Sequence, residues 1–225
     1  MLVVESNTYW YFAGWSALWF VTLLAPPGFT SIPSTYRLHF VHGVVCTVMA
    51  LLSIYEVVPE SAATMSTISY FIVDFIKNLL NDFIFQVKGY QTPSARKLEY
   101  AHHIMCCSVG VILELHRDSI CHSGANAFIK FMFAEVSTPF LMIWRVYPEQ
   151  YLGWLFAFVF FLNRLVYHGM LYIPEAMQQC YKYPWLAWGF AVPYNLMNLA
   201  FFYLILSKLF RKQKTLTNDG KKLKD

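Results

Sequence analysis

Long apolar runs follow one another through this chain, and each is close to the roughly 20 residues that a membrane-spanning helix needs. Charged residues make up only 13% of the sequence, whereas they make up about 25% of a soluble globular domain. This combination predicts an all-α, polytopic membrane protein with about seven transmembrane helices. The expected spans cover residues 9–25, 38–58, 65–87, 98–115, 127–146, 151–173 and 185–210.

Positive charge is distributed unevenly between the loops that connect these spans. One side of the membrane receives seven lysines and arginines of the C-terminal segment together with Arg37, Lys88, Arg96, Lys97 and Arg145. The other side receives Arg117 and Lys182. Because positively charged segments stay in the cytosol, this asymmetry predicts a cytosolic C-terminus. The basic polar tail, residues 212–225, is expected to lie against anionic lipid, and no nucleic acid partner is expected.

Ionisable residues interrupt the apolar runs between residues 97 and 146. His102 and His103 stand side by side in one run, which also contains Glu114, and Glu135 stands within the next. A charge inside the hydrocarbon core costs at least about 2.5 kcal/mol. We therefore expect these groups to face a polar interior, where they mark a candidate functional site.

Helical spacing gathers further polar residues into stripes, one on nearly every span after the first. The stripes, in chain order, are His39, His42, Cys46, Met49 and Ser53; Asp74, Lys77, Asn78, Asn81 and Asp82; His103, Cys107, Gly110 and Glu114; Arg164 and His168; and Tyr194, Asn195 and Asn198. Six such helices in a ring would enclose a polar-lined cavity. Each stripe also has a structural interpretation, since Asp74 and Lys77 are spaced for an ion pair and Arg164 is a possible partner for Glu135.

Metal binding is not expected from the sequence, and no cofactor is predicted. A di-metal desaturase would need repeated histidine boxes, and this chain has the His102-His103 pair and scattered single histidines. The His39-x-x-His42 spacing is one weak match on a presumed helix. The five cysteines form no C-x-x-C pair and suggest no zinc site or disulfide framework.

Four sequence pieces, in this order and spacing, resemble the TLC domain, a membrane domain shared by the ceramide synthases and related proteins. They are SYFIVDFI at 69–76, the His102-His103 pair, AEVSTPFL at 134–141 and FFLNRLVYHGMLYIP at 160–174. The resemblance covers residues 36–211, after an N-terminal transmembrane helix in residues 1–35. It is greatest to the small TLC-domain-containing transmembrane proteins.

This resemblance implies a TLC-type bundle of six helices, a location in the endoplasmic reticulum and a role with lipids. In the ceramide synthases, a histidine pair and a later His-Asp pair carry acyl transfer from acyl-CoA. His102 and His103 match the first pair, whereas Ala134 and Glu135 occupy the place of the second. The acid is kept as glutamate and the histidine is lost, so acyl transfer is disfavoured.

The function expected from the sequence is binding or sensing of a phospholipid or sphingolipid, without catalysis, as part of membrane lipid homeostasis. The predicted cavity residues are Asp74, Lys77, Asn78, His103, Glu135, Arg164, His168 and Asn198. One alternative is a structural subunit of a larger membrane complex, such as one in the mitochondrial inner membrane. The other is a lipid acyltransferase with His102, His103 and Glu135 as its catalytic residues.

Overall fold

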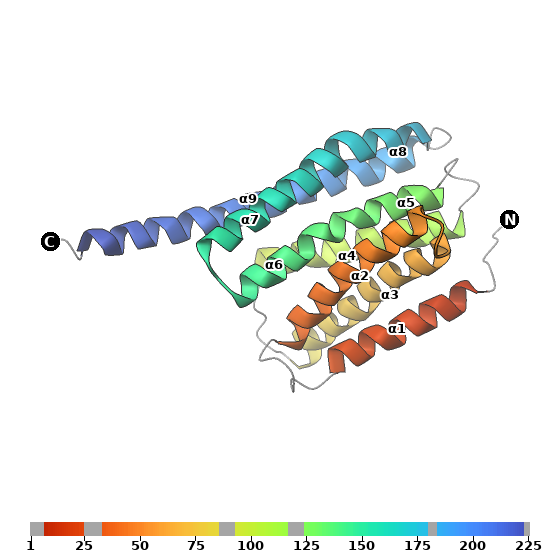
Figure 1. The fold of residues 1–225 in the computed structure, drawn as a ribbon, viewed down its shortest axis with the longest axis horizontal. Helices are drawn as coiled ribbons and strands as arrows, with labels where there is room; N and C mark the ends of the chain where they lie inside the picture. The colour runs from red at the N-terminus through yellow and green to blue at the C-terminus, as the bar shows by residue number, and fades with distance from the viewer. Residues whose placement is uncertain (1–6, 25–32, 86–92, 117–123, 180–183, 223–225) are drawn as a thin grey trace.

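The structure, a computed structural model, describes residues 7–24, 33–85, 93–116, 124–179 and 184–222, and these residues are almost entirely helical. Its elements are α1 (Thr8–Leu24), α2 (Ser34–Ile54), α3 (Glu60–Leu79), η2 (Leu80–Ile84), α4 (Pro93–Leu115), α5 (Gly124–Met132), η3 (Phe133–Val136), α6 (Ser137–Val146), α7 (Gln150–Phe160), η4 (Phe161–Tyr172), α8 (Ile173–Gln179) and α9 (Pro184–Lys222). Consecutive elements join into seven continuous rods over the described residues (Figure 1). Each rod overlaps one predicted span, so the all-α prediction is confirmed.

Four stretches of the described residues are long and apolar enough to cross a membrane. They are Ser34–Ile54, Ala95–Leu115, Gln150–Gln178 and Trp188–Arg211. The helix α1 is shorter, with 17 residues, and α3 carries buried charged residues that lower its hydropathy. The protein is therefore a multi-pass membrane protein with four spans supported by length and composition.

Proline marks the start of several helices. Pro33 and Pro59 occupy the positions immediately before α2 and α3, and α4 and α9 begin at Pro93 and Pro184. A proline has no N–H to satisfy and its fixed φ suits the first turn of a helix, so these positions follow from the sequence.

One predicted span end is wrong. The sixth span was expected to end at Pro174, but the chain continues as α8 to Gln179. The π-helical segment η4 ends at Tyr172, two residues before this proline, and its wider turns provide room for a ring that a regular α-helical turn would exclude. The seventh span was expected to end near residue 210, which agrees with the apolar stretch Trp188–Arg211. The helix α9 itself continues through the start of the basic tail to Lys222.

The fifth predicted span is also not one uniform helix, because the 3₁₀ turn η3 separates α5 from α6. The cause is Pro139, whose ring conflicts with the carbonyl of Glu135 four residues earlier in a regular helix. The turn is tightened at this point, and α2 packs closely against it. A Cβ atom on Gly43 would lie 2.5 Å from Cδ of Pro139 and 3.1 Å from the carbonyl oxygen of Glu135.

We predict that Gly43→Ala destabilises the protein by about 1–3 kcal/mol, because the added methyl group overpacks this contact between α2 and α6. Gly189→Ala is the matched control, since a Cβ there meets nothing within 4 Å. That substitution is expected to be neutral or to stabilise α9 by up to about 1 kcal/mol. Unfolding of the two variants in mixed detergent micelles measures the difference, and equal stabilities would contradict the close packing at Gly43.

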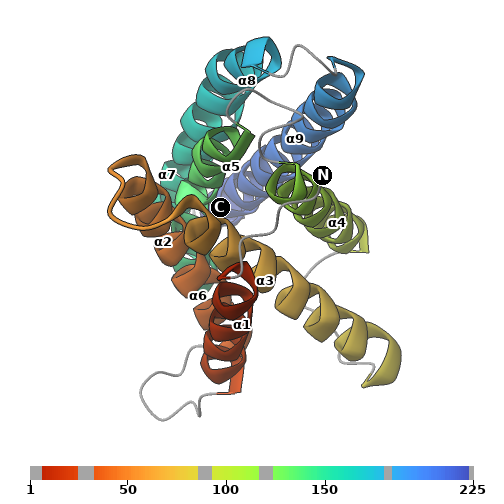
Figure 2. The ribbon, with the colours of Figure 1, turned by 90° about the vertical axis from the view of Figure 1, so that its right-hand side faces the viewer.

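The rod α5–η3–α6 runs through the middle of the bundle. It contacts α2, α3, α4, α7 and η4, and Figure 2 shows the neighbouring helices around it. The later six rods therefore do not form the simple ring that the stripes suggested. The α5–η3–α6 rod occupies the centre of the bundle instead. Its Glu135 has partners on several neighbouring helices, which holds the rod in this position. The helix α1 lies outside this arrangement and packs on α2 and α3.

Candidate functional site

Asp74 is the centre of a group of buried polar side chains, the Asp74 cluster. Lys77 forms an ion pair with Oδ1 of Asp74, and Nδ2 of Asn78 donates to Oδ2 at 3.0 Å. Two histidines approach from other helices: Nε2 of His39 on α2 lies 3.7 Å from Oδ1, and Nε2 of His103 on α4 lies 3.4 Å from Oδ2. The predicted pairing of Asp74 with Lys77 is confirmed, and the carboxylate gathers three helices around it.

Glu135 is the centre of a second group, the Glu135 cluster. Arg164 on η4 donates from its Nη2 to Oε1 at 2.9 Å, and the hydroxyl of Thr138 donates to Oε2 at 2.6 Å. Nε2 of His102 lies 3.7 Å from Oε1, and Nε2 of His42 lies 3.9 Å from Oε2. The prediction that Glu135 lies inside the bundle, within reach of a cation and a histidine, is confirmed.

The two adjacent histidines of α4 belong to different clusters. Successive residues of an α-helix are about 100° apart around its axis, so His102 and His103 point in different directions. His102 lies near Glu135 and His103 lies near Asp74, with the two ring centres 5.8 Å apart. The sequence pair is therefore a link between the two clusters rather than a two-histidine site of its own.

Tyr70 provides a second link between the clusters. Its ring stacks on that of His42 with a centroid distance of 3.4 Å and an interplanar angle of 4°. Its hydroxyl makes a 2.7 Å hydrogen bond with Nδ1 of His39. Tyr70 thus contacts one histidine from each cluster, and Phe71 packs edge-on against both His102 and His103.

Small side chains allow α3 to hold these groups at the centre of the bundle. Every residue from Ser61 to Phe71 is buried, and most of the first nine are Ser, Ala or Thr. Such residues let membrane helices approach closely, and their hydroxyls bond to nearby backbone, as those of Ser66 and Ser69 do within α3. The close packing of α1 and α2 on this helix excludes lipid from the polar residues that follow.

Two further residues predicted to line the cavity, His168 and Asn198, are buried in the bundle. His168 is fully buried, and its ring nitrogens lie 2.7 Å from the backbone carbonyl oxygen of Asn163 and 3.2 Å from that of Phe131, one of which accepts the ring N–H. It therefore satisfies the backbone around the π-helical segment η4 and is a packing residue. Asn198 is fully buried on α9, four residues after the buried Tyr194.

Three residues near the buried carboxylates, His39, His42 and Glu99, are not among the site residues predicted from the sequence. His39 and His42 were placed in a stripe but treated as a weak metal motif, although each approaches a carboxylate. Glu99 is not among the predicted site residues, and it stands at the polar beginning of its span. Its spacing four residues before His103 was the available signal, because that spacing places both residues on one face of α4.

Several ring nitrogens of the clustered histidines lack a hydrogen-bond partner, whereas the carboxylate oxygens of Glu135 are bonded. Among the described residues, both ring nitrogens of His42, Nδ1 of His103 and Nε2 of His39 are buried without a hydrogen-bond partner. Such atoms are rare in native proteins and require an explanation, such as a bound ligand or water. Glu135, in contrast, has both oxygens bonded, so it joins helices. Ala134, at the place of the lost histidine, is 1% exposed.

A separate apolar groove of about 440 Å³ lies where the end of α1, the start of α2 and the end of α6 meet. Its lining consists of Val21, Thr22, Tyr36, Arg37, Phe40, Val41, Met142, Ile143, Val146 and Tyr147. The hydroxyl of Thr22 donates to the carbonyl of Leu18 in its own helix, which leaves a mostly apolar wall. Arg37 lines the groove near the start of α2, and Arg145 lies over the ring of Tyr36 at 5.8 Å.

Comparison with models of known families, with curated proteins and with solved structures finds no match to this chain. The resemblance to the TLC domain therefore stays a prediction from the residues that carry it. The function has to be argued from the groove and the two clusters.

Proposed function

We propose that this protein binds an anionic membrane lipid in the groove between α1, α2 and α6, and that it contributes to lipid homeostasis without catalysing a reaction. The observation that carries this proposal is the groove itself, an apolar channel with an arginine among its lining residues. Its volume of about 440 Å³ is within the range of ligand sites in proteins. In a membrane, the most abundant ligand of this chemistry is a lipid.

The arrangement of the groove matches the two ends of a lipid. The acyl chain lies along Phe40, Val41 and Met142, which are apolar and lie deeper in the bundle. The headgroup lies at the ends of the helices, where Arg37 and Arg145 provide positive charge. Arg37 is three residues from the start of α2 and thus only about 5 Å along the helix axis. This depth suits the boundary between headgroups and hydrocarbon.

The groove explains lipid binding better than the two clusters do. The predicted cavity residues include Asp74, His103 and Glu135, but Asp74 and Glu135 are paired with Lys77 and Arg164. An anionic headgroup at either carboxylate would meet a group of like charge. The predicted excess of positive charge on this side of the bundle also favours an anionic lipid, because the cytosolic leaflet is the more negative one. The TLC resemblance supports a role with lipids and a location in the endoplasmic reticulum.

We predict that Arg37→Gln lowers the preference for anionic over zwitterionic lipid about tenfold, since a charge-assisted hydrogen bond contributes about 1.5 kcal/mol or more. The second variant is Ile143→Trp, which fills the groove from α6 and should reduce the amount of lipid retained. Native mass spectrometry of the full chain, exchanged into phosphatidylserine or phosphatidylcholine micelles, measures both effects.

Matched controls lie on α9, away from the groove. Arg211→Gln removes the same charge near the C-terminal end of the predicted spans, and Leu199→Trp adds the same ring to a residue that is 53% exposed. Both controls should retain lipid as the unmodified chain does. Equal lipid retention by Ile143→Trp and Leu199→Trp, or an equal loss of preference in both arginine variants, would refute binding in this groove.

A further inference from the structure

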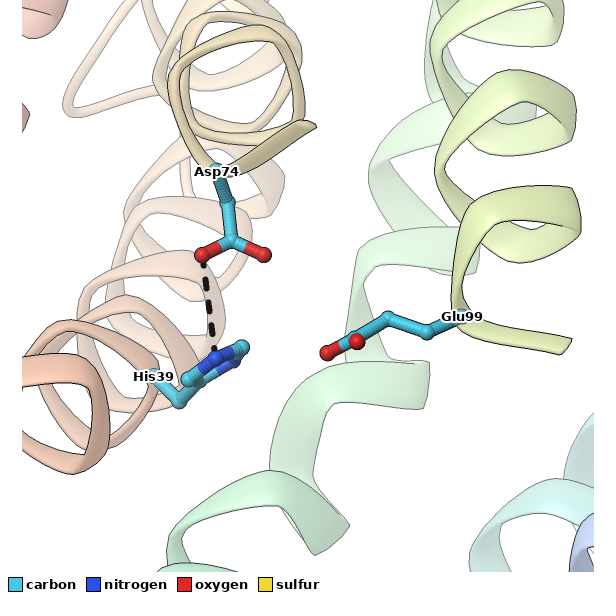
Figure 3. Close-up of side chains that lie close together, drawn as sticks. All are labelled: His39, Asp74 and Glu99. Atoms are coloured by element: carbon cyan, nitrogen blue, oxygen red, sulfur yellow. Dashed lines mark ion pairs between the residues drawn. The ribbon is translucent and has the colours of Figure 1, made fainter. Parts of the chain in front are cut away.

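We propose that His39, Asp74 and Glu99 form a binding site for a first-row divalent metal ion, with Zn²⁺ and Mn²⁺ as its best probes. Each residue offers one ligand atom, and the three atoms lie within 4.8 Å of one another. They come from three different helices, α2, α3 and α4, and Figure 3 shows the side chains directed toward a common space. This site is independent of the lipid groove and goes beyond the function proposed above.

His39 and Asp74 each use one polar atom for the proposed metal ion and the other polar atom for a hydrogen bond that orients the side chain. Nδ1 of His39 is bonded to the hydroxyl of Tyr70 at 2.7 Å, which leaves Nε2 facing Asp74 at 3.7 Å. Oδ2 of Asp74 accepts from Asn78, which leaves Oδ1 on the side of His39. Metal sites in proteins use such outer contacts to fix the ring and the carboxylate. Nε2 of His39 is buried without a hydrogen-bond partner, so a ligand for it is missing.

The third ligand is held in the same way. Arg96 donates to Oε2 of Glu99 at 2.8 Å and also contacts Asp82 at 3.1 Å. The hydroxyl of Tyr100 donates to the same oxygen of Asp82, Oδ2, at 2.6 Å. Glu99 is therefore fixed at the start of α4 by a charged network that reaches the end of the α3–η2 rod.

The donor types select the class of ion. An imidazole with two carboxylates suits zinc, manganese or iron, whereas magnesium and calcium prefer oxygen ligands alone. Three protein ligands leave at least one coordination position for water in a four-coordinate zinc site. His103, whose Nε2 lies 3.4 Å from Oδ2 of Asp74, is the nearest further imidazole on α4.

Lys77 is the competitor of the metal ion. Its ammonium group is paired with Oδ1 of Asp74, the oxygen nearest to His39, so it takes the place of a cation on that atom. The network nevertheless retains acidic character, because the carboxylates of Asp74, Asp82 and Glu99 outnumber Lys77 and Arg96 by one. A divalent ion that displaces the ammonium from Oδ1 would neutralise this excess.

The site lies near one end of the bundle. His39 is five residues into α2 and Glu99 six residues into α4, which corresponds to depths of about 8 and 9 Å. Both helices begin at the same end of the bundle. Successive rods run in alternating directions, and α2 and α4 are separated by one rod, α3–η2. The site therefore lies closer to the starts of α2 and α4 than to the middle of these helices.

The experiment measures metal binding by the full chain, purified in detergent without a polyhistidine tag and stripped with a chelator. Equilibrium dialysis against Zn²⁺ or Mn²⁺, followed by elemental analysis, should give one ion per chain. His39→Gln and Asp74→Asn should abolish that ion. Tyr70→Phe should weaken binding about ten- to a hundredfold, because it removes the contact that orients the ring of His39. Lys77→Met should strengthen binding, because it removes the competing ammonium.

Glu175→Gln is the control, since it removes a carboxylate that is paired with Lys130 far along the chain from the site. It should bind as the unmodified chain does. Thermal unfolding reports whether each variant is folded, and where Asp74→Asn is not, Tyr70→Phe and Lys77→Met decide the matter. Absence of a bound ion in the unmodified chain overturns the proposal. So does binding that is unchanged in both Tyr70→Phe and Lys77→Met.

Discussion

Replacing Arg164 with methionine is expected to lower the free energy of unfolding by about 3–5 kcal/mol. Arg164 donates to Glu135 at 2.9 Å, and both side chains are more than nine-tenths buried. Without the guanidinium, the carboxylate is left in the bundle interior with the Thr138 hydroxyl as its hydrogen-bond donor and with no arginine or lysine paired to it. Unfolding in mixed micelles of increasing dodecyl sulfate content measures the change.

The double variant Glu135→Leu with Arg164→Met separates the loss of the pair from the burial of a lone charge. It removes both charged groups, and apolar replacements of a buried pair are often close to neutral. The double variant should therefore be more stable than Arg164→Met alone, even though it carries one more substitution. A double variant as unstable as the sum of the two single variants would show that Arg164 and Glu135 do not act as a pair.

This pair was predictable from the sequence for a simple physical reason. A charge in a membrane span is costly, so an acid in one span and a base in another are expected to find each other. The same argument anticipated the contact of Asp74 with Lys77, because residues three apart on a helix lie on one face. The distribution of apolar residues likewise predicted the helical rods, whose positions in the chain agree with the expected spans.

The local departures from α-helix were harder to predict. Pro139 signals a break, but the sequence does not state whether the helix kinks, tightens into the 3₁₀ turn η3 or ends. Pro174 was interpreted as an end, and the π-helical segment before it allowed the rod to continue. Whether a helix kinks, tightens or continues at a proline depends on which backbone carbonyl groups receive hydrogen bonds from neighbouring side chains. His168, for example, bonds to the carbonyl oxygen of Asn163, five residues earlier in η4.

The partition of the polar residues into two clusters also required the structure. Spacing along one helix defines a face, but it does not state which helix that face meets. His102 and His103 are adjacent in the sequence and meet different carboxylates. Glu99 joins His39 and Asp74 only because α4 lies beside α3 with the starts of α2 and α4 at one end. That juxtaposition is set by packing over the whole bundle.

Replacing Trp19 with alanine is expected to destabilise the protein by about 3–5 kcal/mol. Trp19 is 0% exposed, and its Nε1 donates to the carbonyl of Ser66 at 3.0 Å and lies 3.1 Å from the hydroxyl of Ser69. Its ring also packs edge-on against His42 and Tyr70, which support the two clusters. Removing the ring leaves a cavity between α1 and α3 that neighbouring side chains cannot fill. The same micelle unfolding experiment measures the loss.

Trp10→Ala is the matched control, because this residue is on the same helix and is 78% exposed. Its loss should change stability by less than about 0.5 kcal/mol, as for other surface substitutions. Trp19→Phe keeps most of the ring and removes the N–H donor, so its cost should lie between the two, near the 0.6 kcal/mol that is typical of a hydrogen bond between membrane helices, with a small packing term added. If Trp19→Ala is no more harmful than Trp10→Ala, then α1 contributes little to the bundle. The histidines of α2 would then be held in place by α3 and the α5–η3–α6 rod alone.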